Sequence, residues 1–215
     1  MFEVCVRKIF QRRGEDDFLK GKPKTGTDHT NLWLDSWSGK MCLNCSYRDF
    51  IVTELDTDYW KKSFYGYPVL GHVVWLEIHM KINTSKLSPN TAYTAYLEFR
   101  LSDYVCYGIH LPIEASVGIS GEEITKETVY FDHRIPMSES NCHCPYTKWM
   151  EAYLNLNFLP PPASLEVKLG DYFNKEGENR DVEIIMKEVK GGRHKFGIHF
   201  ASIEMRPKRL ANLKF

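Results

Sequence analysis

The 215-residue sequence has no long hydrophobic stretch and no excess of charge of either sign. Its apolar runs are only a few residues long, far below the roughly 20 residues that a membrane-spanning helix needs. The 28 basic and 28 acidic residues cancel, so no overall field favours binding to nucleic acid or to an anionic membrane. We therefore expect neither a membrane protein nor a nucleic-acid-binding protein.

The start of the chain also lacks the apolar segment of a secretory signal, because Glu3, Arg7 and Lys8 stand where that segment would lie. We therefore expect a cytoplasmic or nucleocytoplasmic protein that is not secreted. In such a reducing environment the six cysteines are expected to be free thiols.

Two cysteine pairs raise the question of a metal site. Cys42 and Cys45 form a CxxC motif and Cys142 and Cys144 a CxC motif, which together could supply four thiolates to zinc. The pairs are far apart in the sequence, however, and neither is followed by the turn glycine of a zinc knuckle. We interpret them as strand cysteines and a loop pair, and we predict no metal and no cofactor.

The motifs of the common enzyme classes are missing. There is no GxSxG, HExxH, P-loop or GxGxxG sequence, and helical periodicity of the length found in nucleotide-binding α/β folds is lacking. Glu77, Glu98, Glu151 and Glu204 fall on polar faces of candidate strands, where we interpret them as exposed sheet residues. No catalytic residue is predicted, and we expect a protein that is not an enzyme.

What the sequence does contain is alternation of apolar and polar residues, clearest between residues 73 and 101. Two segments with a period of two, 73–82 and 91–101, are joined there by a polar connection that contains Pro89. Such segments are typical of half-buried antiparallel strands. Further candidate strands are residues 43–53, 113–119, 128–131, 165–169, 182–189 and 196–205. The set predicts an all-β fold, an antiparallel β-sandwich of the jelly-roll type.

The ends of the chain differ from this pattern. Residues 1–30 are rich in charge and glycine, and we predict an N-terminal extension that is either a short helix, with Phe2, Val6, Ile9 and Phe10 on one face, or disordered. The sandwich domain is predicted over residues 31–208, followed by a tail at residues 209–215.

Aromatic residues make up 13% of the sequence, with five tryptophans. Trp75 falls on the face opposite Leu76, and Trp60 lies between a polar stretch and two lysines. Rings in such places can stack on the CH faces of a pyranose while nearby polar groups bind its hydroxyls. The alternative is that the rings close the ends of the core.

Several segments, in order and at similar spacing, resemble the plant phloem protein 2 lectins, also called Nictaba-like lectins. The resemblance covers roughly residues 31 to 208. The matching segments are Tyr47–Thr53, Asp58–Trp60, Val74–Ile78, Leu87–Tyr93, Tyr96–Leu101, Lys168–Asn174, Asp181–Ile184 and Ile203–Lys208.

The resemblance implies a jelly-roll β-sandwich that binds N-acetylglucosamine oligomers, or the chitobiose core of N-glycans, without catalysis. It also implies a location in cytosol, nucleus or phloem sap. Trp60 corresponds to a tryptophan implicated in sugar binding in the family, with Tyr59 beside it. A second such tryptophan is replaced here by Glu54, so one stacking position is lost.

The family usually continues from a tryptophan and a glutamate directly into the next strand. Here Trp149 and Glu151 are separated from that strand by residues 152–166, which we interpret as an insertion, either a genuine loop or an error in the gene model. Pro160, Pro161 and Pro162 cannot join a central strand, because proline lacks the donor for the ladder. We predict Trp149 and Glu151 as further carbohydrate-binding residues.

We thus predict a lectin with Trp60, Tyr59, Trp149 and Glu151 in its site and N-acetylglucosamine-containing glycans or glycoproteins as partners. A homodimer would raise its avidity. The alternative is a structural or interaction protein of the phloem that keeps the fold with weak or lost sugar binding. Cys142 and Cys144 could then form thiol crosslinks.

Overall fold

The computed structural model describes a β-rich domain. The described residues are 10–11, 24–25, 30–52, 60–62, 68–70, 75–101, 112–122, 124, 126–131, 164–176, 179–188, 195 and 197–208. Their regular structure consists of strands and two short 3₁₀ turns. Among these residues, none belongs to a helix with the length and apolar character needed to cross a membrane.

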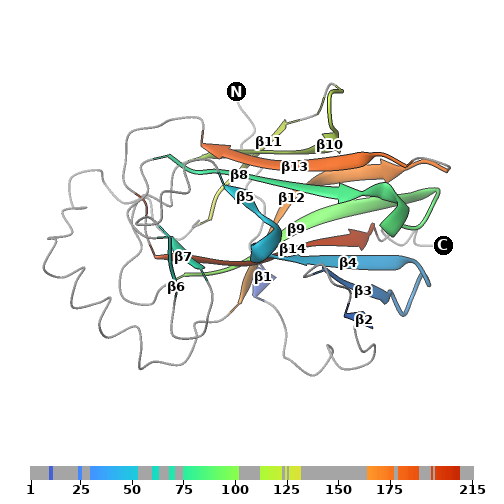
Figure 1. Cartoon of the computed structure of the whole chain (residues 1–215), viewed down its shortest axis with the longest axis horizontal. Coiled ribbons are helices and arrows are strands. Elements are labelled where there is room, and N and C mark those ends of the chain that lie inside the picture. Colours follow the sequence, from blue (N-terminus) through green and yellow to red (C-terminus); the bar gives the residue numbers. More distant parts are fainter. Residues whose placement is uncertain are drawn as a thin grey trace, which may run out of the picture.

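The strands form two antiparallel sheets that lie face to face (Figure 1). The path of the larger sheet is β1 (Phe10–Gln11), β12 (Leu165–Asn174), β9 (Thr91–Leu101), β14 (Ile198–Pro207), β4 (Met41–Ser46), β3 (Thr30–Leu34) and β2 (Lys24–Thr25). The hairpin of β6 (Trp60–Lys62) and β7 (Pro68–Leu70) joins it through β14. The smaller sheet contains β11 (Lys126–Val129), β10 (Ile113–Ile119), β13 (Asp181–Glu188), β8 (Glu77–Asn83) and β5 (Ile51–Val52). The predicted antiparallel β-sandwich is therefore confirmed.

The core lies between the sheets and follows the predicted alternation. On β9, Tyr93, Leu97 and Phe99 are fully buried, whereas Tyr96 and Glu98 lie on the opposite, outer face. Phe99 and Phe200 each make an edge-to-face contact with Phe131, which follows β11 of the smaller sheet, with centroids 5.1 and 5.9 Å apart. Aromatic contacts thus join the two layers.

The two strands predicted between residues 73 and 101 lie in different sheets. β8 pairs with β13 and β5, whereas β9 pairs with β12 and β14. The 3₁₀ turn at Thr84–Lys86 carries the chain across, and the Asn83 side chain caps it by accepting from the Ser85 amide at 3.0 Å. The first strand also starts later than predicted, at Glu77.

The single strand predicted at residues 43–53 is wrong for a similar reason. β4 ends at Ser46, a 3₁₀ turn follows at Tyr47–Asp49, and β5 belongs to the other sheet. The Ser46 hydroxyl accepts from the Arg48 amide and starts the turn. Both sheet changes therefore occur at turns capped by a short polar side chain.

The N-terminal extension also differs from one of its predicted forms. Phe10, placed on a helical face by the sequence, lies in β1, which pairs with β12 at Glu166 and Leu165. Ladder pairing with β12 explains why an extended conformation is adopted there. The domain limits at residues 30/31 and 208/209 stay predictions.

A β-bulge in β12 decides which residues face outward. The register with β9 shifts between Lys168 and Gly170, so Leu169 and Gly170 are both buried, and Lys168 and Asp171 share the outer face. A Cβ on Gly170 would lie 2.9 Å from Cγ2 of Val117 in the smaller sheet. The bulge thus depends on a glycine that lets the sheets approach closely.

Candidate functional site

The predicted carbohydrate-binding residues lie mostly outside the described part of the chain. Tyr59, Trp149 and Glu151 are not among the described residues. Trp60 begins β6, where its backbone pairs with Leu70 of β7. β7 in turn pairs with β14 at His199. Trp60 therefore belongs to the larger sheet, two strands from β14.

The outer face of the larger sheet carries an array of polar side chains that we call the polar plate. Its members come from four neighbouring strands, and cross-strand pairing aligns them in rows. In one row Glu204 pairs with Tyr96 and with Asn44, and in the next Glu98 pairs with Glu166 and with Ser202. The polar plate consists of Asn44, Tyr96, Glu98, Glu166, Ser202, Glu204 and Arg206.

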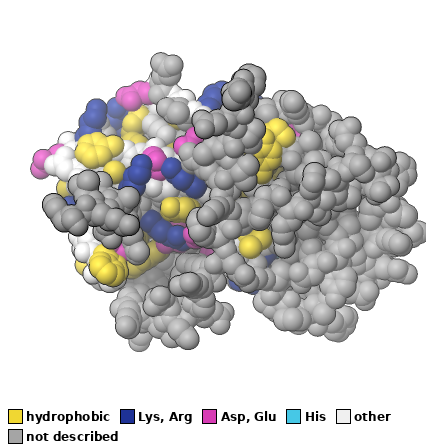
Figure 2. All heavy atoms as spheres, turned by 180° about the vertical axis from the view of Figure 1, so that it is seen from behind, with side chains coloured by type: hydrophobic (Ala, Val, Ile, Leu, Met, Phe, Trp, Pro, Cys, Tyr) yellow, Lys and Arg dark blue, Asp and Glu magenta, His cyan; other side chains and the backbone are white. Residues whose placement is uncertain are grey.

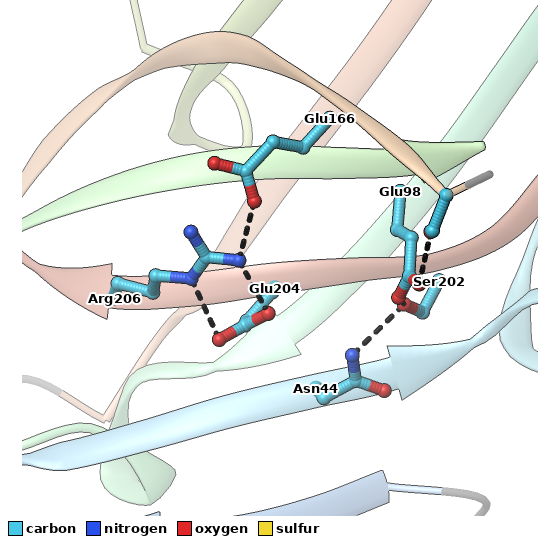
Figure 3. Close-up of polar contacts among 7 residues, drawn as sticks. Asn44, Glu98, Glu166, Ser202, Glu204 and Arg206 are labelled. Carbon is cyan, nitrogen blue, oxygen red and sulfur yellow. Dashed lines mark hydrogen bonds and ion pairs between the residues drawn. The ribbon is translucent and has the colours of Figure 1, made fainter. Parts of the chain in front are cut away.

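Glu98 forms one centre of the polar plate (Figure 3). The Ser202 hydroxyl donates to its Oε2 at 3.0 Å, and the Ser164 hydroxyl donates to its Oε1 at 2.5 Å. Asn44 Nδ2 donates to Ser202 Oγ at 2.8 Å. The carboxylate is thereby held in place by two hydroxyls, in the way that it would accept hydrogen bonds from hydroxyls of a sugar.

Arg206 forms the second centre. Its Nε and one terminal nitrogen donate to the two oxygens of Glu204 at 2.7 and 2.8 Å, and the same terminal nitrogen donates to Glu166 at 2.8 Å (Figure 3). Its guanidinium also lies over the Tyr96 ring, 4.6 Å from the centroid. Burial alone would lower the pKa of Arg206, but the bonds with Glu204 and Glu166 outweigh burial and raise it.

The interpretation of Glu204 as an exposed sheet residue is wrong. Its exposed fraction is only 3%, and Glu98 is partly buried. Sequence reasoning also missed Asn44, Glu166, Ser202 and Arg206 as a group. The available signal was their place at outward positions of strands, but the order of those strands was needed to bring them together.

Beside the polar plate, Asp171 forms a smaller cluster. Its Oδ1 accepts from the Thr94 hydroxyl at 2.7 Å, and its Oδ2 accepts from the Lys168 and Lys208 ammonium groups at 2.6 and 2.9 Å. Burial raises the pKa of Asp171, but the bonds from Lys168, Lys208 and Thr94 outweigh it and bring the pKa to about 2.

The outer face of the smaller sheet holds a different polar cluster. Trp75 Nε1 donates to Glu77 at 3.3 Å, and Glu77 contacts His79 at 2.9 Å and Lys187 at 3.5 Å. Burial raises the pKa of Glu77, but these bonds and the Lys187 charge together lower it. Trp75 is half-buried, held by the neighbouring carboxylate.

The predicted thiol pairs are described only in part. Cys42 and Cys45 are buried thiols in β4, whereas Cys142 and Cys144 lie outside the described residues. Within the described ranges, no group of three or more His, Cys, Asp or Glu side chains is arranged to hold a metal ion.

Comparison with known proteins identifies the family. The family model described as phloem protein 2 matches residues 40–207. The chain is 31% identical to the F-box protein PP2-B10 of Arabidopsis thaliana over 85% of its length, and 30% identical to the F-box protein At2g02240 of the same plant over 83%. It spans 66% and 55% of the lengths of these two relatives.

Among solved structures, the chain resembles a family 35 carbohydrate-binding module from Clostridium thermocellum, with 11% identity and a TM-score of 0.36. That overlay covers 77% of this chain and 92% of the module, and at such a TM-score it does not establish a shared topology. The match to the family model, which extends over most of the chain, leads to the conclusion that this chain belongs to the phloem protein 2 family.

Proposed function

We propose that this protein binds carbohydrate, recognising N-acetylglucosamine oligomers or the core of N-glycans, and that it catalyses no reaction. The observation that carries the proposal is the polar plate. It brings carboxylate, amide, hydroxyl and guanidinium groups together with the Tyr96 ring on one face of a rigid sheet. Sugars are held by such fixed polar groups beside an aromatic surface.

The hydrogen bonds within the polar plate suit binding. Most of these side chains are held by a neighbour on another strand, and Glu204 is held by Arg206 of its own strand, so little conformational freedom is lost when a ligand arrives. Glu98 is held by hydroxyls, and Glu204 and Glu166 by Arg206. A sheet face of this kind lets a linear oligosaccharide contact several strands at once.

The same bonds support a function without catalysis. Glycoside hydrolysis requires one carboxylic acid that donates a proton to the leaving group and a second carboxylate placed for attack or for activating water. In the polar plate Glu98, Glu166 and Glu204 all accept hydrogen bonds from hydroxyl or guanidinium groups. They are therefore held as hydrogen-bond acceptors, and the acceptors proposed for ligand hydroxyls are Glu98 and Glu166, which are only partly buried, whereas Glu204 is buried.

The mixed sign of the surface charges is consistent with binding of an uncharged ligand. Figure 2 shows basic and acidic side chains lying among hydrophobic ones on the described part of one face. Charges of mixed sign do not create the field that attracts nucleic acid. We propose a cytoplasmic or nucleocytoplasmic location, where glycoproteins or free chitooligosaccharides would be the ligands.

The decisive test is calorimetric titration of the protein with chitotriose. We expect binding by the wild type, and a loss of roughly tenfold or more in affinity for Glu98→Gln, because a charged acceptor is removed. Glu114→Gln, on the outer face of the smaller sheet where Glu114 pairs with Lys126 at 2.8 Å, is the matched control and should bind normally. If the wild type binds no N-acetylglucosamine oligomer, the proposed function is wrong.

Trp60 can be tested in the same titration. We expect Trp60→Ala to weaken binding, because the resemblance to the family places a stacking tryptophan at this position. Retained affinity in this variant would refute only the assignment of Trp60 and would leave the polar plate as the site.

A second candidate function is interaction with another protein. It is favoured by Trp37, whose exposed fraction is 84%, and by the exposed Leu34, both in the β3–β4 hairpin. Two hydrogen bonds hold the loop, in which Asp35 accepts from both the amide and the hydroxyl of Ser38 at 2.9 and 2.7 Å. Crosslinking through Cys142 and Cys144 belongs to the same candidate, and a non-reducing gel after mild oxidation would disprove it by showing monomer alone.

A further inference from the structure

The surface of the polar plate continues beyond β4, because β3 extends the larger sheet on that side (Figure 1). Asn31 of β3 pairs with Asn44, a member of the polar plate, and Trp33 pairs with Cys42. Residues directly opposite each other in antiparallel strands have their side chains on the same face of the sheet. Asn31 and Trp33 therefore lie beside the polar plate on the outer face.

The other residues of β3 support this orientation. Thr30 is buried, with its hydroxyl 3.8 Å from Sγ of the buried Cys45, and Leu32 packs against the core. Because side chains alternate along a strand, Asn31 and Trp33 point away from the core. Both are half-buried, so part of each side chain is in contact with solvent.

The outward side chains at this end of the sheet are uncharged. Asn44 uses one amide hydrogen to donate to Ser202 Oγ at 2.8 Å, and Asn31 adds a second amide with two donors and an acceptor. The carboxylate beside Asn44 in the ladder is that of Glu204, which is 3% exposed and accepts from Arg206 through both oxygens. On the described part of β3 and β4, a ligand therefore meets amides and an indole ring.

Trp33 and Asn31 lie two residues apart on one face of β3. This spacing along a strand is about 7 Å, which allows one ligand ring to contact both side chains. A pyranose matches the pair, because its CH face stacks on an aromatic ring while its hydroxyls bond to an amide. A purely apolar ligand would leave the amide without a hydrogen-bond partner.

The position of β3 determines how long a ligand must be to reach it. One cross-strand row of the outer face runs through Tyr96, Glu204, Asn44 and Asn31. Three steps between neighbouring strands, of about 4.8 Å each, place the ends of this row about 14 Å apart. A disaccharide seated on Tyr96 does not reach Asn31, whereas a longer oligosaccharide lying across the strands does.

We propose that Trp33 and Asn31 form an additional subsite, which takes a further ring of a linear oligosaccharide that lies across the polar plate. This inference rests on the proposed carbohydrate binding and extends the site by one strand. The match to the family model begins at residue 40, whereas β3 ends at Leu34. The subsite therefore belongs to a strand that the family model does not include.

The experiment measures the affinities of chitobiose and chitohexaose by calorimetric titration. We expect Trp33→Ala to weaken chitohexaose binding by about tenfold and to leave chitobiose binding unchanged, because only the longer ligand reaches β3. Trp37→Ala is the matched control, since Trp37 is 84% exposed in the turn that follows β3, and it should change neither affinity.

Two results of this titration would overturn the subsite alone. In one, Trp33→Ala and the wild type bind chitohexaose equally well. In the other, Trp33→Ala weakens both ligands by the same factor, which would indicate a general effect on the fold. Failure of the wild type to bind either ligand would overturn the proposed function as well.

A spectroscopic measurement tests direct contact with the ligand. Trp33→Phe keeps an aromatic ring and should retain most of the chitohexaose affinity, but it should lose part of the change in tryptophan fluorescence that chitohexaose causes in the wild type. Asn31→Leu should weaken chitohexaose binding and spare chitobiose binding, because the amide is lost. If the fluorescence change in Trp33→Phe equals that of the wild type, the assignment of Trp33 is wrong.

Discussion

Individual residues show most clearly where the sandwich tolerates charge. Lys195 and Glu188 form an ion pair at 2.5 Å, with exposed fractions of 1% and 0%. Glu188 continues the inward series of β13, after Val182, Ile184 and Met186. A charge in such a place needs its partner, because water is not available to solvate it.

We predict that Lys195→Met lowers the free energy of unfolding by about 3–5 kcal/mol, since Glu188 is left buried and unpaired. Urea unfolding measures the effect. Lys126→Met is the control, because its pair with Glu114 is solvent-exposed and should contribute less than about 1 kcal/mol. The double variant Glu188→Leu and Lys195→Met should recover most of the loss. Equal effects of the two lysine substitutions would contradict this account.

At the scale of elements, the bulge of β12 joins the packing of the sheets to the outer surface. It turns Leu169 and Gly170 inward together, and it allows Lys168 and Asp171 to meet on the outside at 2.6 Å. The close approach of Val117 to Gly170 shows that the smaller sheet packs directly on this point.

We predict that Gly170→Ala destabilises the fold by about 1–3 kcal/mol through overpacking, because the new methyl group would meet Val117. Thermal unfolding of the variant measures this loss. Gly39→Ala is not an equivalent control, since Gly39 has a positive φ of 62°. The better comparison is Gly170→Ala combined with Val117→Ala, which should regain part of the stability. No regain would show that the strain lies in the backbone.

Elements also show what the sequence could predict. The bounds of β9 and β10 agree with the predicted segments 91–101 and 113–119, because uninterrupted alternation sets them locally. The sheet changes after Ser46 and Asn83 were not predicted, since they depend on which distant strand offers a partner. Outer positions such as Glu98 and Ser202 were identifiable one strand at a time, but their proximity follows from β9 and β14 being neighbours.

At the scale of the whole molecule, acid should destabilise the fold. Burial and then the charge of Arg100 lower the pKa of His199 from its usual 6.5 to about 4. Between pH 6.5 and about 4, His199 takes up a proton in the unfolded chain but stays neutral in the folded protein. The free energy of unfolding is therefore greatest above pH 6.5 and falls as the pH approaches 4. Asp171 adds a second loss, as the pH falls from 3.8 towards about 2.

Urea unfolding across this pH range tests the prediction. His199→Gln should flatten the dependence between pH 6.5 and 4, because glutamine does not titrate. Asp171→Asn should leave the pH dependence of stability between pH 6.5 and 4 unchanged and alter it only below pH 3.8. A wild-type stability that stays constant from neutral pH to pH 4 would exclude the assigned role of His199.

The two outer faces of the molecule also differ in kind. The larger sheet presents the polar plate, with Glu204 only 3% exposed, whereas the smaller sheet presents ion pairs such as Lys126–Glu114 that are open to solvent. The proposed binding of carbohydrate on the polar plate leaves the other side of the sandwich as a surface for immobilisation in binding assays.

The β-bulge in β12 affects how related sequences should be aligned. In a homologue with the same number of residues but no bulge, strict alternation after Lys168 would turn the residue aligned with Phe173 towards the core and the one aligned with Tyr172 towards solvent. Two relatives could then have the same residues in this strand and expose different aromatic rings. Alignments of this family should therefore be anchored on the glycine at position 170 and its bulge before any surface residue is transferred between members.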